Sequence, residues 1–280
     1  MSQLTVLLEG LSFPEGPRWR GGRLWFSDFY AHEVVAVDPA GRRERIATVP
    51  GQPSGLGWLP DGRLLVVSMT DRKLLRLDPD GLHVAADLWD LAGFHCNDMV
   101  VDAEGRAYVG NFGFDHYTQT EEKPANLIRI DPDGTVSVAA EGLRFPNGAV
   151  ITPDGRRLII AETRGQRLTA FDRAPDGALS NRRIFADLGP NFPDGICLDA
   201  EGAVWVADPR NREAIRVREG GAITHRIPTG ERGAYACMLG GEDRRTLFVC
   251  TALASGPKAA AMRSGRIEHV RVEVPGAGLP

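Results

Sequence analysis

A tight turn followed by a short apolar strand recurs along this chain at intervals of 40 to 50 residues. The turn glycines are 40, 43, 50 and 47 residues apart, at Gly22, Gly62, Gly105, Gly155 and Gly202. A sixth, more degenerate copy has Glu242-Asp243 at its turn. A glycine can adopt the positive φ of a tight hairpin, and a period of this length with several short strands is typical of propeller blades. Six copies predict an all-β, six-bladed β-propeller with four-stranded antiparallel blades around a central channel.

The repeats run through most of the chain without a Ser/Gly-rich linker or a long helical pattern, so we expect residues 1–280 to form a single domain. The apolar run at 5–8 is expected to pair with the C-terminal residues 266–274, which would close the ring and leave no long open edge. Residues 112–124 lengthen the third repeat. This insertion is either an inert excursion or a cap over a functional site.

The composition argues against several kinds of partner. The 33 Lys+Arg are scattered among 37 Asp+Glu, so we expect neither nucleic-acid nor membrane binding and instead a small-molecule ligand. No basic segment followed by an apolar run opens the chain, and no stretch approaches the roughly 18 apolar residues of a membrane helix. We therefore expect a cytoplasmic protein. The four cysteines lack zinc-type spacing and are expected to be buried free thiols.

A second repeated feature is the frame Phe-Pro-x-Gly, which occurs at 13–16, 145–148 and 192–195. Counting back eight residues from the turn glycines, with one residue less in the first repeat, places one residue per repeat in an equivalent position. We call these the slot residues: Glu15, Ser54, Asn97, Asn147, Asp194 and Tyr235. They precede the innermost strands, so a closed propeller would gather them at the mouth of its channel.

The slot residues predict a metal site. One Glu, one Asp and two Asn converging on an axis suit a hard cation, with Ca²⁺ the first choice and Mn²⁺, Zn²⁺ or Mg²⁺ as alternatives. Zn²⁺ normally prefers His and Cys, and neither occupies a slot. Pro-Asn-Gly and Pro-Asp-Gly are also ordinary turn sequences, but four polar residues in one register favour a site. The predicted ligands are Glu15, Asn97, Asn147 and Asp194.

The chain resembles the SMP-30/gluconolactonase/LRE-like family of six-bladed, metal-dependent lactonases. The resemblance rests on Pro14-Glu15-Gly16-Pro17-Arg18-Trp19, Asn97-Asp98, Pro146-Asn147-Gly148 and Pro193-Asp194-Gly195 with Ala207-Asp208. It implies Glu15, Asn147 and Asp194 as metal ligands and Asn97 as a metal-adjacent residue that contacts substrate. His95 stands where sugar-lactone members similar to the vertebrate protein carry Arg. Because an imidazole does not replace the guanidinium fork, we expect a substrate less sugar-like than gluconolactone.

The predicted reaction is hydrolysis of a lactone ring ester. A divalent metal would polarise the carbonyl and stabilise the oxyanion. Asp194 is the candidate general base toward water, and Glu15 is the second catalytic carboxylate and a charge-balancing ligand. His95, and His116 and Tyr117 in the insertion, are candidate substrate contacts. We expect Asp98 to brace its loop and Asp208 to be a strand-end hydrogen-bond partner rather than a base.

Three alternatives to lactone hydrolysis differ in their requirements. Phosphotriester or aryl ester hydrolysis could use the same metal site. A non-catalytic binding scaffold would keep the metal for structure alone. A serine hydrolase of the nucleophile-elbow type is excluded, since Gly-x-Ser-x-Gly is absent from the sequence.

Overall fold

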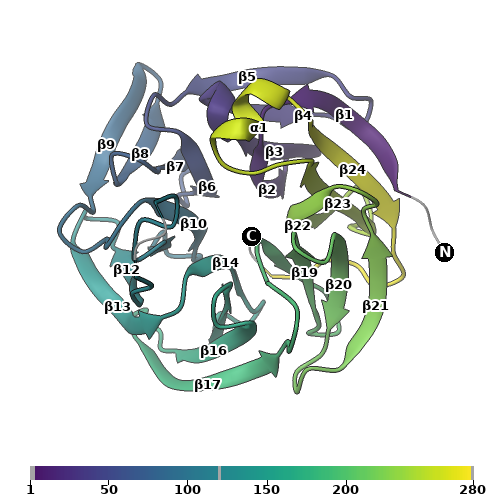
Figure 1. The fold of residues 1–280 in the computed structure, drawn as a ribbon. Helices are drawn as coiled ribbons and strands as arrows, with labels where there is room; N and C mark the ends of the chain where they lie inside the picture. Colours follow the sequence, from purple (N-terminus) through teal and green to yellow (C-terminus); the bar gives the residue numbers. More distant parts are fainter. Residues whose placement is uncertain (1–3, 119–120, 279–280) are drawn as a thin grey trace.

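The structure is a computed structural model that describes residues 4–118 and 121–278. Over this part of the chain, 24 strands form six four-stranded antiparallel sheets arranged as blades around a common axis (Figure 1). The helical segments among the described residues are η1 (Phe29–Ala31) and α1 (Pro257–Met262). The predicted six-bladed propeller is therefore confirmed.

The blades are numbered in chain order, and the strands of each run from the innermost to the outermost. Blade 1 consists of β2 (Pro14–Arg20), β3 (Arg23–Asp28), β4 (Glu33–Val37) and β5 (Arg43–Thr48). Blade 2 consists of β6 (Pro53–Trp58), β7 (Leu64–Ser68), β8 (Lys73–Asp78) and β9 (Gly81–Asp87). Blade 3 consists of β10 (Cys96–Val101), β11 (Ala107–Asn111), β12 (Ala125–Ile130) and β13 (Val136–Leu143).

The remaining three blades follow the same order. Blade 4 consists of β14 (Pro146–Ile151), β15 (Arg157–Glu162), β16 (Arg167–Arg173) and β17 (Leu179–Asp187). Blade 5 consists of β18 (Ile196–Leu198), β19 (Val204–Asp208), β20 (Glu213–Val217) and β21 (Ile223–Pro228). Blade 6 consists of β22 (Gly233–Gly240), β23 (Thr246–Ala252), β24 (Gly265–Arg271) and β1 (Thr5–Leu11).

Blade 6 joins the two ends of the chain. Strand β1 pairs antiparallel with β24, from Thr5 opposite His269 to Leu11 opposite Gly265. This pairing confirms the expected closure. In Figure 1, the purple N-terminal strand lies beside the yellow C-terminal strand on the outside of the ring.

Burial explains the strand pattern of each blade. Every residue of β7, β11 and β19 is buried, because both faces of these inner strands pack against neighbouring blades. Apolar runs without polar alternation therefore mark the inner strands. The outermost strands such as β17 expose polar side chains. All four cysteines lie within the described residues and are buried and free, as predicted.

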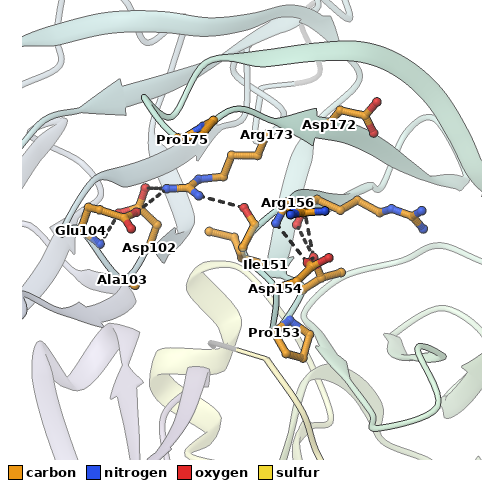
Figure 2. A pocket seen from close by; sticks show the side chains of 13 residues that line it. Asp102, Ala103, Glu104, Ile151, Pro153, Asp154, Arg156, Asp172, Arg173 and Pro175 are labelled. Carbon is orange, nitrogen blue, oxygen red and sulfur yellow. Dashed lines mark hydrogen bonds and ion pairs between the residues drawn. The ribbon is translucent and has the colours of Figure 1, made fainter.

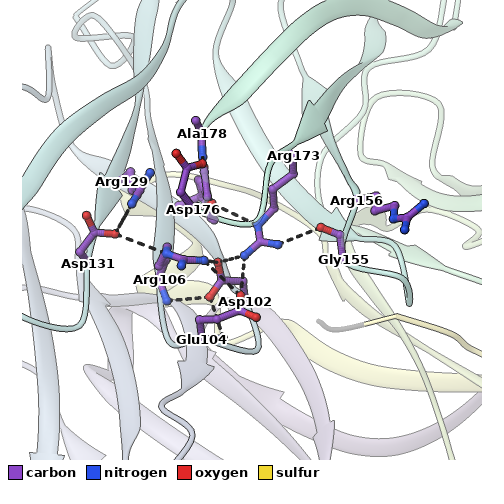
Figure 3. A network of polar contacts seen from close by, with 12 residues as sticks. Asp102, Glu104, Arg106, Arg129, Asp131, Gly155, Arg156, Arg173, Asp176 and Ala178 are labelled. Carbon is purple, nitrogen blue, oxygen red and sulfur yellow. Dashed lines mark hydrogen bonds and ion pairs between the residues drawn. The ribbon is translucent and has the colours of Figure 1, made fainter.

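The turn glycines found from the repeat lie at the end of the inner hairpins opposite the slot residues, and all five have positive φ, as predicted. At that end, Arg173 of blade 4 reaches blade 3 (Figure 3). Its guanidinium pairs with Asp102, and it also donates to Glu104 Oε2 at 2.7 Å and to the Gly155 carbonyl at 2.8 Å. Arg173 and Asp102 are buried and Glu104 is half-exposed, and together they tie the two blades.

No helix in the described part of the chain is long and apolar enough to cross a bilayer.

Candidate active site

The slot residues lie at the beginning of the innermost strands. Five of them belong to these strands: Glu15 to β2, Ser54 to β6, Asn97 to β10, Asn147 to β14 and Tyr235 to β22. Asp194 lies two residues before β18 begins at Ile196. The six residues thus occupy one end of the ring of inner strands.

A register irregularity follows the slot residue in five blades. In blade 1, Glu15 is opposite Ser27 and Arg18 is opposite Trp25, so the inner strand contains one extra residue. Blades 2, 3, 4 and 6 have irregularities at the same place. A bulge bends its strand and redirects a side chain that regular alternation would send into the sheet. The bulge therefore accounts for the orientation of the slot side chains. Apart from the repeat itself, no residue pattern in the sequence indicates the bulge.

The glycine of the Phe-Pro-x-Gly frame is needed for packing between blades. A Cβ atom at Gly148 would lie 2.5 Å from the Ile196 nitrogen, and one at Gly195 would lie 2.5 Å from Ala236 Cβ. Such separations leave no room for a side chain, so glycine lets adjacent inner strands approach closely. Each slot residue is consequently held against the neighbouring blade.

Glu15 and Asp194 form a pair of acids near the axis. Burial raises the pKa of Glu15 well above its ordinary value, and the carboxylates of Asp194 and Asp98 raise it further. Burial likewise raises the pKa of Asp194, and the charges of Asp98 and Asp208 add to this rise. Asn147 opposes it by donating a hydrogen bond to Asp194. The structure therefore brings Glu15, Asn147 and Asp194 together.

The charge of Arg18 acts on Glu15 and lowers its pKa, but the guanidinium is paired with Asp98. Its Nη2 atom lies 2.6 Å from Asp98 Oδ1 and also donates to the Met99 carbonyl at 2.6 Å. Its Nε atom donates to the Leu56 carbonyl at 3.0 Å. Among the described side chains, no Lys, Arg or His forms an ion pair with Glu15 or Asp194. Asp98 braces its loop, as predicted, by accepting from Arg18 and from the Met99 amide.

This donor set fits a divalent cation. A buried carboxylate is costly unless a positive charge compensates it, and these two carboxylates lack a cationic partner within the described part of the chain. The Asn147 amide nitrogen donates to Asp194 and to Thr163 Oγ1 at 3.2 Å, which leaves its carbonyl oxygen for a ligand. Asn97 is buried in the equivalent position of β10. Carboxylate and amide oxygens are the ligands that Ca²⁺ prefers.

A layer of strand-end acceptors supports the slot residues and was missed at the sequence level. Asp28 accepts from the Phe13 amide at 2.7 Å, Glu162 from the Arg144 amide at 2.8 Å, and Asp208 from the Phe192 amide at 3.1 Å. Each acceptor ends the second strand of its blade and fixes the segment before a slot residue. The predicted role of Asp208 as a strand-end partner is confirmed. The sequence signal that could have found this layer was a polar residue ending an apolar strand.

The three candidate substrate contacts lie in one aromatic group. The ring of His95 stacks on Phe94 at 4.1 Å and is 6.0 Å from the Tyr117 ring. The ring of His116 is 4.0 Å from that of Tyr117. Burial and Arg72 lower the pKa of His95, and burial and Arg164 lower the pKa of His116 to about 4. Both imidazoles are therefore neutral near pH 7.

The described residues of the 112–124 insertion pack at the same end of the molecule as the slot residues. Phe112 stacks on Phe145 of the second Phe-Pro-x-Gly frame at 4.6 Å. The first residues of the insertion, 112–114, are thus buried against the frame, whereas 117–118 and 121–124 are exposed. Residues 119 and 120 of the insertion lie outside the described residues.

Tyr235, the sixth slot residue, has no role that the sequence alone could assign. Burial raises the pKa of its phenol to about 12, with the charges of Asp194 and Glu15 as further causes, while Ser255 donates a hydrogen bond that opposes the rise. The Gly195 amide donates to the Tyr235 carbonyl at 2.8 Å, so Tyr235 lies next to the residue that follows Asp194. The register of the repeat was the signal that could have identified it.

Two other features do not belong to this site. A cavity of about 840 Å³ opens between the turns of blades 3 and 4 (Figure 2), at the opposite end of the inner strands. Among the described residues, one group of three His or Asp side chains has ligand atoms within 4.8 Å of one another: Asp78, Asp80 and His83. Asp78 is already paired with Arg76 and Arg63, at 2.7 and 3.1 Å, which neutralises its carboxylate.

The sequence matches a known family model over most of its length. The matching description is the SMP-30/Gluconolactonase/LRE-like region, over residues 13–253. A pentonolactonase of Haloferax volcanii is 27% identical over 252 residues, which cover 88% of this chain and 84% of the relative. A 6-deoxy-6-sulfogluconolactonase of Pseudomonas putida is 25% identical over 280 residues, covering 95% and 93%.

Solved structures show the same architecture. A gluconolactonase of Xanthomonas campestris superposes with a TM-score of 0.76 at 25% identity, covering 98% of this chain and 90% of its own. A calcium-binding regucalcin of Agrobacterium tumefaciens superposes with a TM-score of 0.82 at 24% identity, covering 98% and 95%. The second likeness supports the fold alone.

Proposed function

The chain belongs to the SMP-30/gluconolactonase/LRE-like family, and on this basis we propose that it is a lactonase whose active site is the slot-residue end of the propeller. Several of its relatives are named as lactonases. The observation that carries the proposal is the pair of buried acids, Glu15 and Asp194, which has no cationic partner among the residues that the structure describes. The expected ligand is a small lactone.

Each residue of the site has its own role. Glu15, Asn147 and Asp194 would hold a divalent cation, with Asn97 beside it, and Ca²⁺ fits these oxygen donors best. Bound there, the cation supplies a Lewis acid for the ester carbonyl. Mn²⁺, Mg²⁺ and Zn²⁺ are the alternatives to test.

Proton transfer falls to Asp194. As general base it takes a proton from water, whose oxygen bonds to the carbonyl carbon, and returns it to the ring oxygen as the C–O bond breaks. The product is a hydroxy acid. Asn97 orients water or substrate, and Glu15 balances the charge. Tyr235, beside the two acids, can donate to a developing oxyanion.

The other interpretations of the site are less favoured. The sequence also allowed phosphotriester or aryl ester hydrolysis and a non-catalytic scaffold, but the relatives named above are lactonases. The absence of nucleic-acid and membrane partners and the cytoplasmic location remain predictions.

The test is hydrolysis of γ- and δ-lactones by metal-stripped protein with Ca²⁺, Mn²⁺, Mg²⁺ or Zn²⁺ added back. We expect activity to return with metal and to fall by about 10²–10⁴-fold in Asp194→Asn, because a positioned general base contributes that much. Asp133→Asn, which changes an exposed turn carboxylate, is the matched control. Undiminished hydrolysis by Asp194→Asn at saturating metal would remove Asp194 from the mechanism, and no lactone hydrolysis with any metal would overturn the proposed function.

A further inference from the structure

A connected group of ring side chains lies beside the slot residues and includes one of them, Tyr235. We call it the aromatic collar and define it by Phe13, Tyr30, His95, Tyr117, Phe145 and Tyr235. Three of these, Phe13, His95 and Phe145, lie two residues before the slot residues Glu15, Asn97 and Asn147. The proposed function leaves most of the collar unused, although it includes the Phe of two Phe-Pro-x-Gly frames.

The collar is continuous across blades. Phe13 meets Tyr235 with ring centroids 4.6 Å apart and Tyr30 at 6.0 Å. Tyr30 and Tyr117 share a hydrogen bond between their hydroxyl groups. Tyr117 is 6.0 Å from His95.

The other side of the collar is joined by Phe112, a residue of the insertion. Its ring is 6.3 Å from that of Tyr117 and is stacked on Phe145 at 4.6 Å. Rings from blades 1, 3, 4 and 6 therefore meet at the slot-residue end. Glu15 and Asp194 lie at this same end of the inner strands, and the charges of both act on Tyr235 of the collar.

The polar atoms of the collar are mostly occupied. The hydroxyls of Tyr30 and Tyr117 bond to each other, and that of Tyr235 accepts from Ser255, which leaves the Tyr235 O–H free to donate. Among the described residues near these rings, the buried polar atoms without a hydrogen-bond partner are His95 Nδ1, His116 Nδ1 and Arg72 Nε. The rings of the collar themselves thus offer few polar atoms to a ligand.

The charged side chains that act on these histidines are Arg72, Asp115 and Arg164. Arg72 lies over the Trp89 ring at 4.1 Å and donates to the Ala92 carbonyl at 3.0 Å. Asp115 accepts from the amides of Tyr117 and Thr118, at 3.0 and 3.3 Å. Arg164 is exposed. A polyhydroxylated ring that rests on the rings of the collar would place hydroxyl groups against carbon atoms that offer no hydrogen bond, at a free-energy cost for each.

We propose that the substrate is a lactone with an apolar or aromatic substituent and few hydroxyl groups, and that Tyr117 and His95 determine this specificity. The inference rests on the proposed lactonase function and adds the substrate class to it. Burial of an apolar substituent against rings is favourable without any directional partner. Tyr117 is 42% exposed, so a substituent that covers it removes further apolar surface from water.

The experiment compares kcat/KM for δ-decalactone and glucono-δ-lactone, using the full-length protein with the metal that supports turnover. We expect the alkyl lactone to be preferred by about tenfold or more, the scale of discrimination that an apolar pocket provides. Tyr117→Ala should raise KM for δ-decalactone with kcat nearly unchanged, because the ring binds ground state and transition state alike. Glucono-δ-lactone should be little affected.

Conservative and remote variants separate specificity from folding. Tyr117→Phe keeps the ring and should retain the preference, and His95→Asn should weaken it, whereas His83→Asn on the outside of blade 2 should change nothing. Preference for glucono-δ-lactone, or equal losses on both substrates in Tyr117→Ala, would overturn the substrate class while the lactonase function stands. Failure to hydrolyse either substrate or any other lactone with any metal would overturn both proposals.

Discussion

At the scale of single residues, the ionised forms of Glu15 and Asp194 are unfavourable in the metal-free protein. Each carboxylate loses hydration on burial, and each lies near further negative charge from Asp98. The folded state therefore favours their protonated forms. This is the arrangement expected where a bound cation, rather than an arginine, completes the charge balance.

These raised pKa values predict a pH dependence of stability. Between the ordinary values, 4.5 for Glu and 3.8 for Asp, and the raised folded values, the folded protein binds more protons than the unfolded chain. The stabilisation from these two groups is thus complete below about pH 4 and is lost as pH rises through the folded values. We expect chelated protein to lose stability over this range and excess Ca²⁺ to restore it, measured by urea unfolding.

The double variant Glu15→Gln/Asp194→Asn isolates the two groups from the other acids of the protein. It should lack this component of the pH dependence and show no stabilisation by Ca²⁺. Identical pH profiles for chelated wild-type and variant proteins would contradict the assignment.

At the scale of elements, Arg18 holds three inner strands together. It belongs to β2, donates to a carbonyl of β6, and reaches Asp98 and Met99 of β10. Its side chain is almost fully buried, as is that of Asp98. The pair therefore joins the inner strands next to the acid pair and leaves those two carboxylates without an ion pair among the described residues.

Breaking this pair should be costly and coupled. We expect Arg18→Met to lower the free energy of unfolding by about 3–5 kcal/mol, because Asp98 is left as a buried, unpaired charge. Adding Asp98→Asn should recover part of the loss, so a double-mutant cycle by urea unfolding should show strong coupling. Arg42→Met, which breaks the exposed pair with Asp38, should cost no more than about 1 kcal/mol. Additive losses for Arg18 and Asp98 would show that the two act independently.

At the scale of the whole molecule, the ring is closed by pairing of the two ends of the chain. Strand β1 is the outermost strand of blade 6, and its last residue, Leu11, is buried in the core shared with blades 1 and 5. Without it, β24 would become an unpaired edge, which is a site for association with other chains.

Deletion of residues 1–11 should therefore destabilise the entire propeller. The deletion removes the strand pairing with β24 and the buried side chain of Leu11. For domains of roughly 150 to 250 residues, each 1 kcal/mol of lost stability lowers Tm by about 2–4 °C. We expect a clearly lower Tm by calorimetry, together with self-association. A synthetic peptide of residues 4–11 should raise Tm in a concentration-dependent way, since it binds the folded state. An unchanged Tm after deletion would show that closure does not depend on β1.

Local sequence patterns were enough to predict the number of blades, the four-stranded sheets, the closure by the N-terminal strand and the shared register of the slot residues. Turn glycines, apolar runs and a period of 40 to 50 residues carry this information, because each blade repeats them along the chain. The oxygen-rich character of the slot residues could be predicted for the same reason.

Only the folded structure shows which charged side chains pair near the axis and which aromatic rings lie around the slot residues. Arg18 and Asp98 are 80 residues apart in sequence, and the collar draws its rings from four blades. No local pattern encodes such contacts, because they exist only once ring closure brings distant strands to one axis. The engagement of Arg18 with Asp98, which leaves Glu15 and Asp194 for a cation, is therefore a property of the folded ring.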